Sequence, residues 1–232
     1  MTEQPSRAVQ DYLKAIHSLD GAERMVSPLA IAERLRVRAP SVTGMLKRLA
    51  DGGLVDYEPR FGARLTPLGI TEARRVIRRH RLVELLLTRV LGLDWSEVDA
   101  EAEALEHAIS PRLEQAIAAH LGEPLEDPHG HPIPTSEGAL ARRDLRPLHS
   151  FRVGDCVVIR EARDDSPERL RRWRSLGLTP GAKVRFLKHE ALDDLFELQV
   201  AGHIIAQGSE GLTGLLGEIV EDDTSRSAPG PR

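Results

Sequence analysis

Three side chains that can bind a cation or move a proton recur at helical spacing in the stretch EAEALEHAIS, residues 101–110. If this stretch is helical, Glu103, Glu106 and His107 share one face, because side chains three and four positions apart are neighbours. Asp99 and Glu101 add two carboxylates nearby. Like charges at these spacings weaken an isolated helix by a few tenths of a kcal/mol per pair, and a bound cation reverses that sign. The stretch indicates either a solvated acidic face or a metal site.

The single cysteine limits what such a site can contain. Cys156 has no partner for an internal disulfide and cannot form a thiolate cluster, so a metal site must use histidines and carboxylates. We expect Cys156 to be a small core residue. The chain has no apolar run of membrane-spanning length, and its start, MTEQPSRAVQDY, lacks the organisation of a secretory signal. We therefore expect a cytoplasmic protein that does not contact a membrane.

A second polar feature lies in residues 66–92, which read as one long helix capped by Thr66 and closed by Gly92. Its apolar stripe runs through Ala73, Val76, Ile77, Leu87 and Leu91. His80 and Glu84 stand where further core residues are due. Burying an unpaired polar group costs several kcal/mol, so both need partners. Alternatively, His80 and Glu84 could reach water at the edge of the helix or form a simple ion pair.

The front of the chain has the element order of a winged helix-turn-helix. Helical spacing covers residues 7–19, a Ser-Pro start opens a helix over 27–35, and a third helix spans 39–51 before two glycines. The stretch LVDYEPRFGARLT then reads as two short strands joined by a turn.

In this arrangement the third helix enters the major groove of DNA and the wing contacts phosphates. Residues 1–91 carry 16 Lys and Arg against 10 Asp and Glu, residues 92–140 carry 1 against 11, and residues 141–232 carry 15 against 15. A basic front agrees with an anionic partner there. The residues expected at the DNA are Arg38, Pro40, Ser41, Thr43, Gly44, Lys47, Arg48, Arg60 and Arg64.

The pattern changes several times along residues 92–232. Asp94 and Glu97 form an expected capping box for a helix that runs to Ile109, and residues 110–122 form an amphipathic helix able to join a dimer surface. Residues 123–147 lose helical periodicity, and we interpret His129 and His131 there as structural. Residues 148–222 predict about five short strands with one helix in PERLRRWRSLGLTPG, and residues 223–232 predict a disordered tail.

Several of these segments together resemble one known family. They are DYLKAIHSL, APSVTGMLKRLADGGLV, LTPLG, RRHRLVELLLTRVLGL, EALEHAIS and DPHGHPIP. Through them the chain resembles the diphtheria toxin repressor family of metal-dependent regulators over nearly all its length. The resemblance implies a mainly α protein with a β C-terminal module: a winged helix-turn-helix domain (1–72), a helical metal-binding and dimerisation domain (73–140) and an SH3-like domain (148–222).

The resemblance also implies a primary metal site made of Asp11, Glu103, Glu106 and His107. The iron-responsive branch of the family has methionine at the first position and cysteine at the second, whereas the manganese-responsive branch has carboxylates at both. Oxygen ligands suit Mn²⁺, but Fe²⁺ and later ions bind such sites at least as tightly, so selection depends on geometry and availability. We expect Mn²⁺, with Fe²⁺ as the alternative and Zn²⁺, Co²⁺ or Cd²⁺ as substitutes in vitro.

A second, ancillary site is implied at His80, Glu84, Asp99, Glu161 and Asp164. Asp99 replaces a histidine of the family, which weakens the expectation, and Asp165 lies close enough to compete with Asp164. Short manganese-responsive members use an extra carboxylate from the first helix to hold a two-metal cluster. Lys14 stands at that position, so we do not expect a close metal pair of that type.

The implied function is a manganese-dependent repressor of metal-uptake genes, in which metal fixes a homodimer for a palindromic double-stranded DNA operator. An iron-responsive regulator of the same family is one alternative, and a winged-helix regulator that senses a small organic ligand is another. A hydrolase is disfavoured, because EALEH has Glu103 where the inverted zinc-protease motif H-x-x-E-H needs histidine. We expect no enzyme activity.

Overall fold

The computed structural model describes residues 5–163 and 166–221 of the 232-residue chain. Asp164, Asp165 and the predicted tail lie outside the described residues. The chain forms two compact units. The first comprises Met1–Val83, Glu101–Leu125 and Ile133–Ala141, and the second comprises Glu84–Ala100, Glu126–Pro132 and Arg142–Arg232. Among the described helices, none is both long and apolar enough to cross a membrane.

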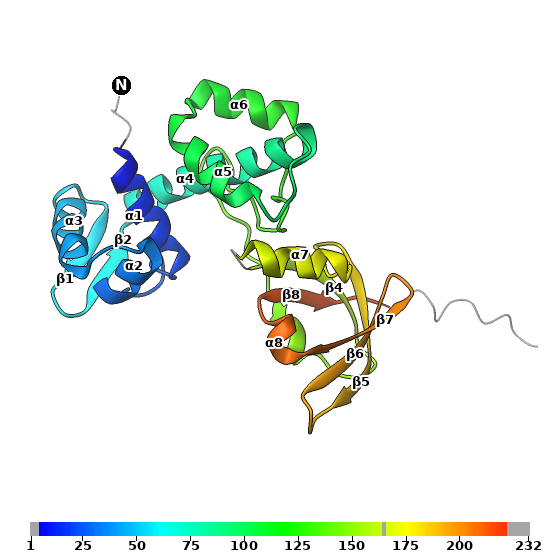
Figure 1. The fold of residues 1–232 in the computed structure, drawn as a ribbon. Helices are drawn as coiled ribbons and strands as arrows, with labels where there is room; N and C mark the ends of the chain where they lie inside the picture. The colour runs from blue at the N-terminus through cyan, green and yellow to red at the C-terminus, as the bar shows by residue number, and fades with distance from the viewer. Residues whose placement is uncertain (1–4, 164–165, 222–232) are drawn as a thin grey trace, which may run out of the picture. The chain divides into compact units, whose positions relative to one another are not determined.

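The first unit begins with three helices and a two-stranded wing, in the predicted order (Figure 1). These elements are α1 (Arg7–Ser18), α2 (Pro28–Leu35), α3 (Ala39–Asp51), β1 (Val55–Glu58) and β2 (Gly62–Leu65). The two strands are antiparallel, with Val55 opposite Leu65. Fully buried apolar residues from all three helices close one core: Leu13, Ile16, Ile31, Val42, Leu46 and Leu49.

Local capping explains where these helices begin. The Ser27 hydroxyl accepts a hydrogen bond from Ala30 N at 3.2 Å, as the Ser-Pro start of α2 predicts. Thr66 does the same for the next helix by accepting from Gly69 N at 3.1 Å. That helix, α4 (Pro67–Leu85), continues as a π-helical turn over Leu86–Val90, so the predicted single helix changes its hydrogen-bond pattern before its end.

The acidic helix is shorter than predicted. Helix α5 spans Val98–Leu105 and is followed by a 3₁₀ turn, Glu106–Ala108. Asp94 does not cap it, because its carboxylate instead accepts from Ser96 N at 2.9 Å and Ser96 Oγ at 2.7 Å, closing a local turn. Helix α6 (Pro111–His120) begins where predicted, with Ser110 accepting from Leu113 N at 3.2 Å.

The second unit contains a six-stranded antiparallel sheet with strand order β3-β8-β4-β5-β6-β7 among the described residues. Its strands are β3 (Arg146–Pro147), β4 (Cys156–Ala162), β5 (Lys183–Glu190), β6 (Leu195–Val200), β7 (His203–Gly208) and β8 (Leu215–Ile219). Helices α7 (Pro167–Ser175) and α8 (Ser209–Leu212) accompany it. The sequence pattern predicts about five strands over residues 148–222, and the two-residue β3 lies outside that range.

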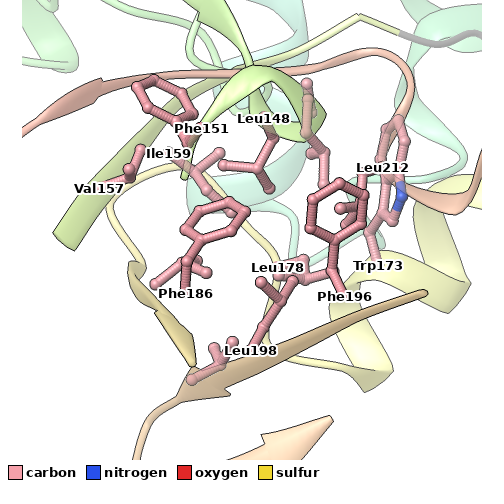
Figure 2. Close-up of a cluster of buried hydrophobic side chains, with 14 of the residues drawn as sticks. Leu148, Phe151, Val157, Ile159, Trp173, Leu178, Phe186, Phe196, Leu198 and Leu212 are labelled. Atoms are coloured by element: carbon pink, nitrogen blue, oxygen red, sulfur yellow. The ribbon is translucent and has the colours of Figure 1, made fainter. Parts of the chain in front are cut away.

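Aromatic and branched side chains fill the core of this sheet (Figure 2). Phe186 and Phe196 meet edge to face at 6.0 Å between ring centroids, a favourable arrangement for two aromatic rings. Trp173 of α7 is fully buried, and its indole N–H donates to Gly211 O at 2.8 Å. Cys156 is only half-buried at the start of β4, so its prediction as a core residue was wrong.

Candidate metal centre and DNA-facing surface

The four residues of the predicted primary site lie together within the first unit. Asp11 comes from α1, Glu103 from the last turn of α5, and Glu106 and His107 from the 3₁₀ turn that follows. Each offers one oxygen or nitrogen, and these atoms all lie within 4.8 Å of one another. Because α5 ends in a 3₁₀ turn, Glu103, Glu106 and His107 all lie on the side that faces Asp11 of α1.

Glu106 is the most buried member of this set. Its side chain is fully buried, and its Oε2 lies 2.6 Å from His80 Nδ1 and 2.8 Å from Lys14 Nζ. Its other oxygen, Oε1, lies 3.4 Å from His107 Nε2. Burial raises the pKa of Glu106, but the hydrogen bond from His80 and the Lys14 ammonium outweigh it and hold that pKa below its usual value. Glu106 is therefore a carboxylate at neutral pH.

A chain of hydrogen bonds orients His107. Gln10 Nε2 donates to Pro5 O at 2.7 Å, which turns Gln10 Oε1 toward His107 Nδ1 at 2.9 Å. Because that oxygen can only accept, the neutral imidazole carries its proton on Nδ1 and presents the Nε2 lone pair. Sequence reasoning missed Gln10, and only its burial next to Asp11 could have indicated a role.

The Nε2 lone pair of His107 faces Asp11. The distance from Nε2 to Asp11 Oδ1 is 2.9 Å, and neither buried atom has a hydrogen-bond partner among the described residues. Two acceptors facing each other are compatible when a cation lies between them, and adjacent ligands of an octahedral ion with ~2.1 Å bonds are about 3 Å apart. Burial raises the pKa of Asp11 above its usual value, and the nearby Glu103 and Glu106 carboxylates raise it further. Three carboxylates and one imidazole thus fit a divalent metal.

The predicted ancillary residues lie in different surroundings. His80 is in the first unit, beside Glu106. Glu84 and Asp99 are in the second unit and offer carboxylate oxygens within 4.8 Å of each other. Glu161 is buried in β4, where its Oε2 lies 2.7 Å from the Arg163 guanidinium. Asp164 lies outside the described residues.

A cluster that the sequence reading treated as structural surrounds His129 in the second unit. Asp127, His129 and His131 offer ligand atoms within 4.8 Å of one another, and Glu84 Oε1 lies 3.3 Å from His129 Nδ1. Asp127 Oδ1 also accepts from the backbone N–H groups of His129 and His131, at 2.8 and 2.9 Å. Burial lowers the pKa of His129, but Glu84 and Asp127 raise it above its usual value overall. The sequence alone did not show that the carboxylates of Glu84 and Asp127 pack against His129.

The expected DNA-facing residues line one side of α3 and the wing. Val42, Leu46 and Leu49 face the core, which leaves the opposite side of the helix exposed. A Cβ added at Gly44 would meet nothing within 4 Å, so packing does not require glycine there. Arg60 lies at the tip of the wing with φ of 79°. The exposed side includes Arg38, Pro40, Ser41, Gly44, Lys47 and Arg48, with Thr43 half-buried and Arg60 and Arg64 exposed on the wing.

Three segments of the chain match known protein families. Residues 6–63 match the family described as iron dependent repressor, N-terminal DNA binding domain, residues 66–135 match its metal binding and dimerisation domain, and residues 146–210 match the FeoA domain. The iron-dependent repressor IdeR of Mycobacterium leprae is 34% identical over 187 residues, which cover 75% of this chain and 80% of that protein. The chain belongs to the diphtheria toxin repressor family.

Two further relatives support the assignment to the diphtheria toxin repressor family. The diphtheria toxin repressor of Corynebacterium diphtheriae is 39% identical over 125 residues, 53% of this chain and 54% of that protein. A solved manganese-dependent transcriptional repressor in complex with manganese has a TM-score of 0.83 at 34% identity and covers 91% of this chain and 100% of its own. As a member of the family, the chain is a DNA-binding, metal-dependent transcriptional repressor and not an enzyme.

Proposed function

We propose that the chain is a manganese-dependent repressor whose primary site consists of Asp11, Glu103, Glu106 and His107. The observation that carries this proposal is the donor set, which contains only oxygen and imidazole nitrogen atoms within 4.8 Å. Hard oxygen ligands suit Mn²⁺, whereas the sulfur ligands of the iron-responsive branch favour softer ions. Relatives named for iron and for manganese both resemble the chain, so the donor set is what favours manganese.

The positions of the proposed ligands support a coupling between metal binding and DNA binding. Asp11 belongs to α1, whose Leu13 and Ile16 pack in the core that supports α3. Glu103, Glu106 and His107 belong to the helical part that follows. These four side chains would hold a divalent ion, which would supply positive charge among three carboxylates. Asp11 then restrains α1 and, through the shared core, the orientation of α3.

The proposed readout is a homodimer on a palindromic operator. Two recognition helices must lie about 34 Å apart to enter successive major grooves on one face of DNA. Restraining α1 in both protomers raises the population of the dimer that meets this spacing. The coupling free energy equals the difference in metal-binding free energy between the DNA-competent state and the other states. We propose that metal-uptake genes are the targets.

The proposal is tested with a DNA duplex selected from a random library in the presence of Mn²⁺. We expect fluorescence anisotropy to show tight binding with Mn²⁺ and loss of binding with a chelator. Glu103→Ala should abolish the Mn²⁺ response. Glu101→Ala is the matched control, because Glu101 is exposed on the same helix and lies outside the ligand set. Binding that neither chelator nor Glu103→Ala weakens would instead indicate a winged-helix regulator of another ligand class.

The identity of the metal needs a separate titration. Mn²⁺, Fe²⁺, Zn²⁺, Co²⁺ and Cd²⁺ should be added to the metal-free protein under anaerobic conditions, with the same duplex as reporter. We expect activation by Mn²⁺ at micromolar concentrations. Activation by Fe²⁺ without any response to Mn²⁺ would replace this proposal with the iron-responsive alternative.

We propose that an ancillary ion binds in the second unit at Glu84 and His129, with Asp127 and His131 beside them. The 3.3 Å approach of Glu84 to His129 and the burial of both support this assignment. It modifies the predicted set by adding His129, while the contributions of His80, Asp99, Glu161 and Asp164 stay predictions. His129→Ala should lower the Mn²⁺ bound per chain by one in equilibrium dialysis. An unchanged count would remove the site.

A further inference from the structure

Lys14 points its ammonium group into the metal centre from the same helix as Asp11. Its Nζ lies 2.5 Å from Glu103 Oε2, 2.8 and 3.0 Å from the two oxygens of Glu106, and 3.1 Å from His80 Nδ1. The Lys14 side chain is 19% exposed and that of Glu106 is fully buried. A surface ion pair would hold one partner in water, whereas this ammonium donates hydrogen bonds to the Glu103 and Glu106 carboxylates, with His80 beside them.

The two oxygens of Glu106 divide the centre into two positions. Oε1 lies 3.4 Å from His107 Nε2, on the side of Asp11 and His107, and also accepts from Lys14 Nζ at 3.0 Å. Oε2 faces Lys14 and His80, at 2.8 and 2.6 Å. A carboxylate with both oxygens engaged in this way bridges two cation positions. At the first position Asp11 Oδ1 and His107 Nε2 have no hydrogen-bond partner among the described residues, and the second position contains the lysine ammonium.

The donors around the ammonium have the same chemistry as those of the first position. The Glu103 and Glu106 carboxylates accept from the ammonium, with the His80 imidazole 3.1 Å away. The first position is lined by Asp11 and His107, and by the same two carboxylates. Such a set suits a hard divalent ion. The presence of a tethered +1 charge is therefore what distinguishes the two positions.

We propose that the Lys14 ammonium fills a second cation position of this centre, so that one divalent ion binds beside Asp11 and His107 and a second is excluded. This inference rests on the proposed metal-binding function. Lys14 neutralises Glu103 and Glu106 before any metal arrives and holds Glu106 with Oε1 directed toward the first position. It is thus a positioning residue that sets the stoichiometry of the centre.

The experiment counts Mn²⁺ per chain by equilibrium dialysis and elemental analysis, using the full-length protein. Lys14→Glu should bind one more ion than wild type, and low-temperature electron paramagnetic resonance should show a spin-coupled Mn²⁺ pair absent from wild type. Lys14→Ala, which leaves Glu103, Glu106 and His80 in place, should also gain an ion at higher Mn²⁺ concentration. Lys188→Glu is the matched control, because this exposed lysine pairs only with Glu190 among the ion pairs of the described residues.

A double variant assigns the extra ion to this position. His80 contacts the second position, so Lys14→Glu should add an ion in the wild-type background and none in a His80→Ala background. Because only the difference between backgrounds is compared, an ancillary ion elsewhere does not affect the result.

The outcomes separate the two proposals. If wild type binds no Mn²⁺ that depends on Glu103, the metal-binding function fails. If wild type binds one ion there and neither Lys14 variant gains another, only the inference about Lys14 is overturned. A spin-coupled pair in wild type overturns it as well. Should Lys14→Glu not fold, the count for Lys14→Ala decides the question alone.

Discussion

Gln10 orients His107, a ligand of the proposed metal site. Its side-chain oxygen fixes the His107 proton on Nδ1, so that Nε2 is free to ligate. We predict that Gln10→Leu weakens Mn²⁺ affinity about 10- to 100-fold, the usual cost of losing such a partner. Isothermal titration calorimetry measures this, with Gln115→Leu as an exposed control on α6. Equal affinity for both variants would show that Gln10 does not orient the ring.

Glu103 contributes a carboxylate oxygen to the proposed metal site. Replacing its oxygen with sulfur should favour softer ions, because thiolate selects later metals over Mn²⁺. We predict that Glu103→Cys lowers the ratio of Mn²⁺ to Zn²⁺ affinity by at least about tenfold. Competition titrations with a metal indicator measure the ratio, and Glu101→Cys is the control for an added thiol. A ratio that stays constant would place Glu103 outside the ligand set.

His17 predicts an acid-sensitive contribution to stability. Burial, with Arg74 and Arg81 nearby, lowers its pKa to about 4 from the ordinary 6.5. The unfolded chain therefore takes up a proton that the folded chain resists, so stability is complete above pH 6.5 and falls as pH decreases toward 4. The loss should be about 2 kcal/mol after allowance for partial exposure. Urea unfolding from pH 7 to 4 should show a smaller decline for His17→Gln, and parallel declines would contradict this.

At the scale of elements, two glycines in the DNA-binding part are constrained for different reasons. Gly62 begins β2 with φ of 115°, and a Cβ there would lie 2.0 Å from Val26 O. We predict that Gly62→Ala costs at least about 2 kcal/mol of unfolding free energy. Thermal and urea unfolding measure the cost. A stability loss below that value would mean that the wing adjusts freely.

Gly44 provides the contrasting case. Alanine there meets nothing within 4 Å and is a better helix former than glycine by about 1 kcal/mol. We predict that Gly44→Ala leaves stability equal or higher while weakening binding to the selected duplex, because the added methyl group occupies the helix face that meets DNA. Unchanged DNA affinity would remove Gly44 from the interface.

The helices of the first unit could be predicted from sequence because their caps and breakers are local. Ser27, Thr66 and Ser110 each bond within three residues, so pattern alone locates α2, α4 and α6. Asp94 misled the prediction of α5, since it can close its own turn with Ser96 as easily as it can cap a helix. The spacing of residues does not show which of two competing short-range hydrogen bonds will form.

The site could be predicted only in part. Periodicity places Glu103, Glu106 and His107 together, since they are within one turn of each other. Asp11 is about ninety residues away in sequence, so only family resemblance could add it. The roles of Gln10 and Lys14 depend on tertiary distances to His107 and Glu106, and no local pattern indicates them.

At the scale of the whole molecule, the charge distribution predicts how DNA binding responds to salt. The chain has a formal net charge of −4, yet residues 1–91 carry 16 Lys and Arg against 10 Asp and Glu. Each phosphate contact adds about 0.9 to the slope of log affinity against log salt. Lys47→Gln and Arg60→Gln should each reduce that slope by about 1. Lys188→Gln in the second unit should leave it unchanged, and equal slopes for all three would exclude phosphate contacts at Lys47 and Arg60.

The Lys14 ammonium also affects how steeply DNA binding by such a repressor depends on metal concentration. The Hill coefficient of a cooperative response cannot exceed the number of ions that the assembly binds. A tethered ammonium is present at every metal concentration and so adds nothing to that count. With one ion at this centre in each protomer, a dimer would respond to metal through these centres with a Hill coefficient of at most two. Lys14 would thus make transcription follow metal supply gradually rather than as a steep threshold.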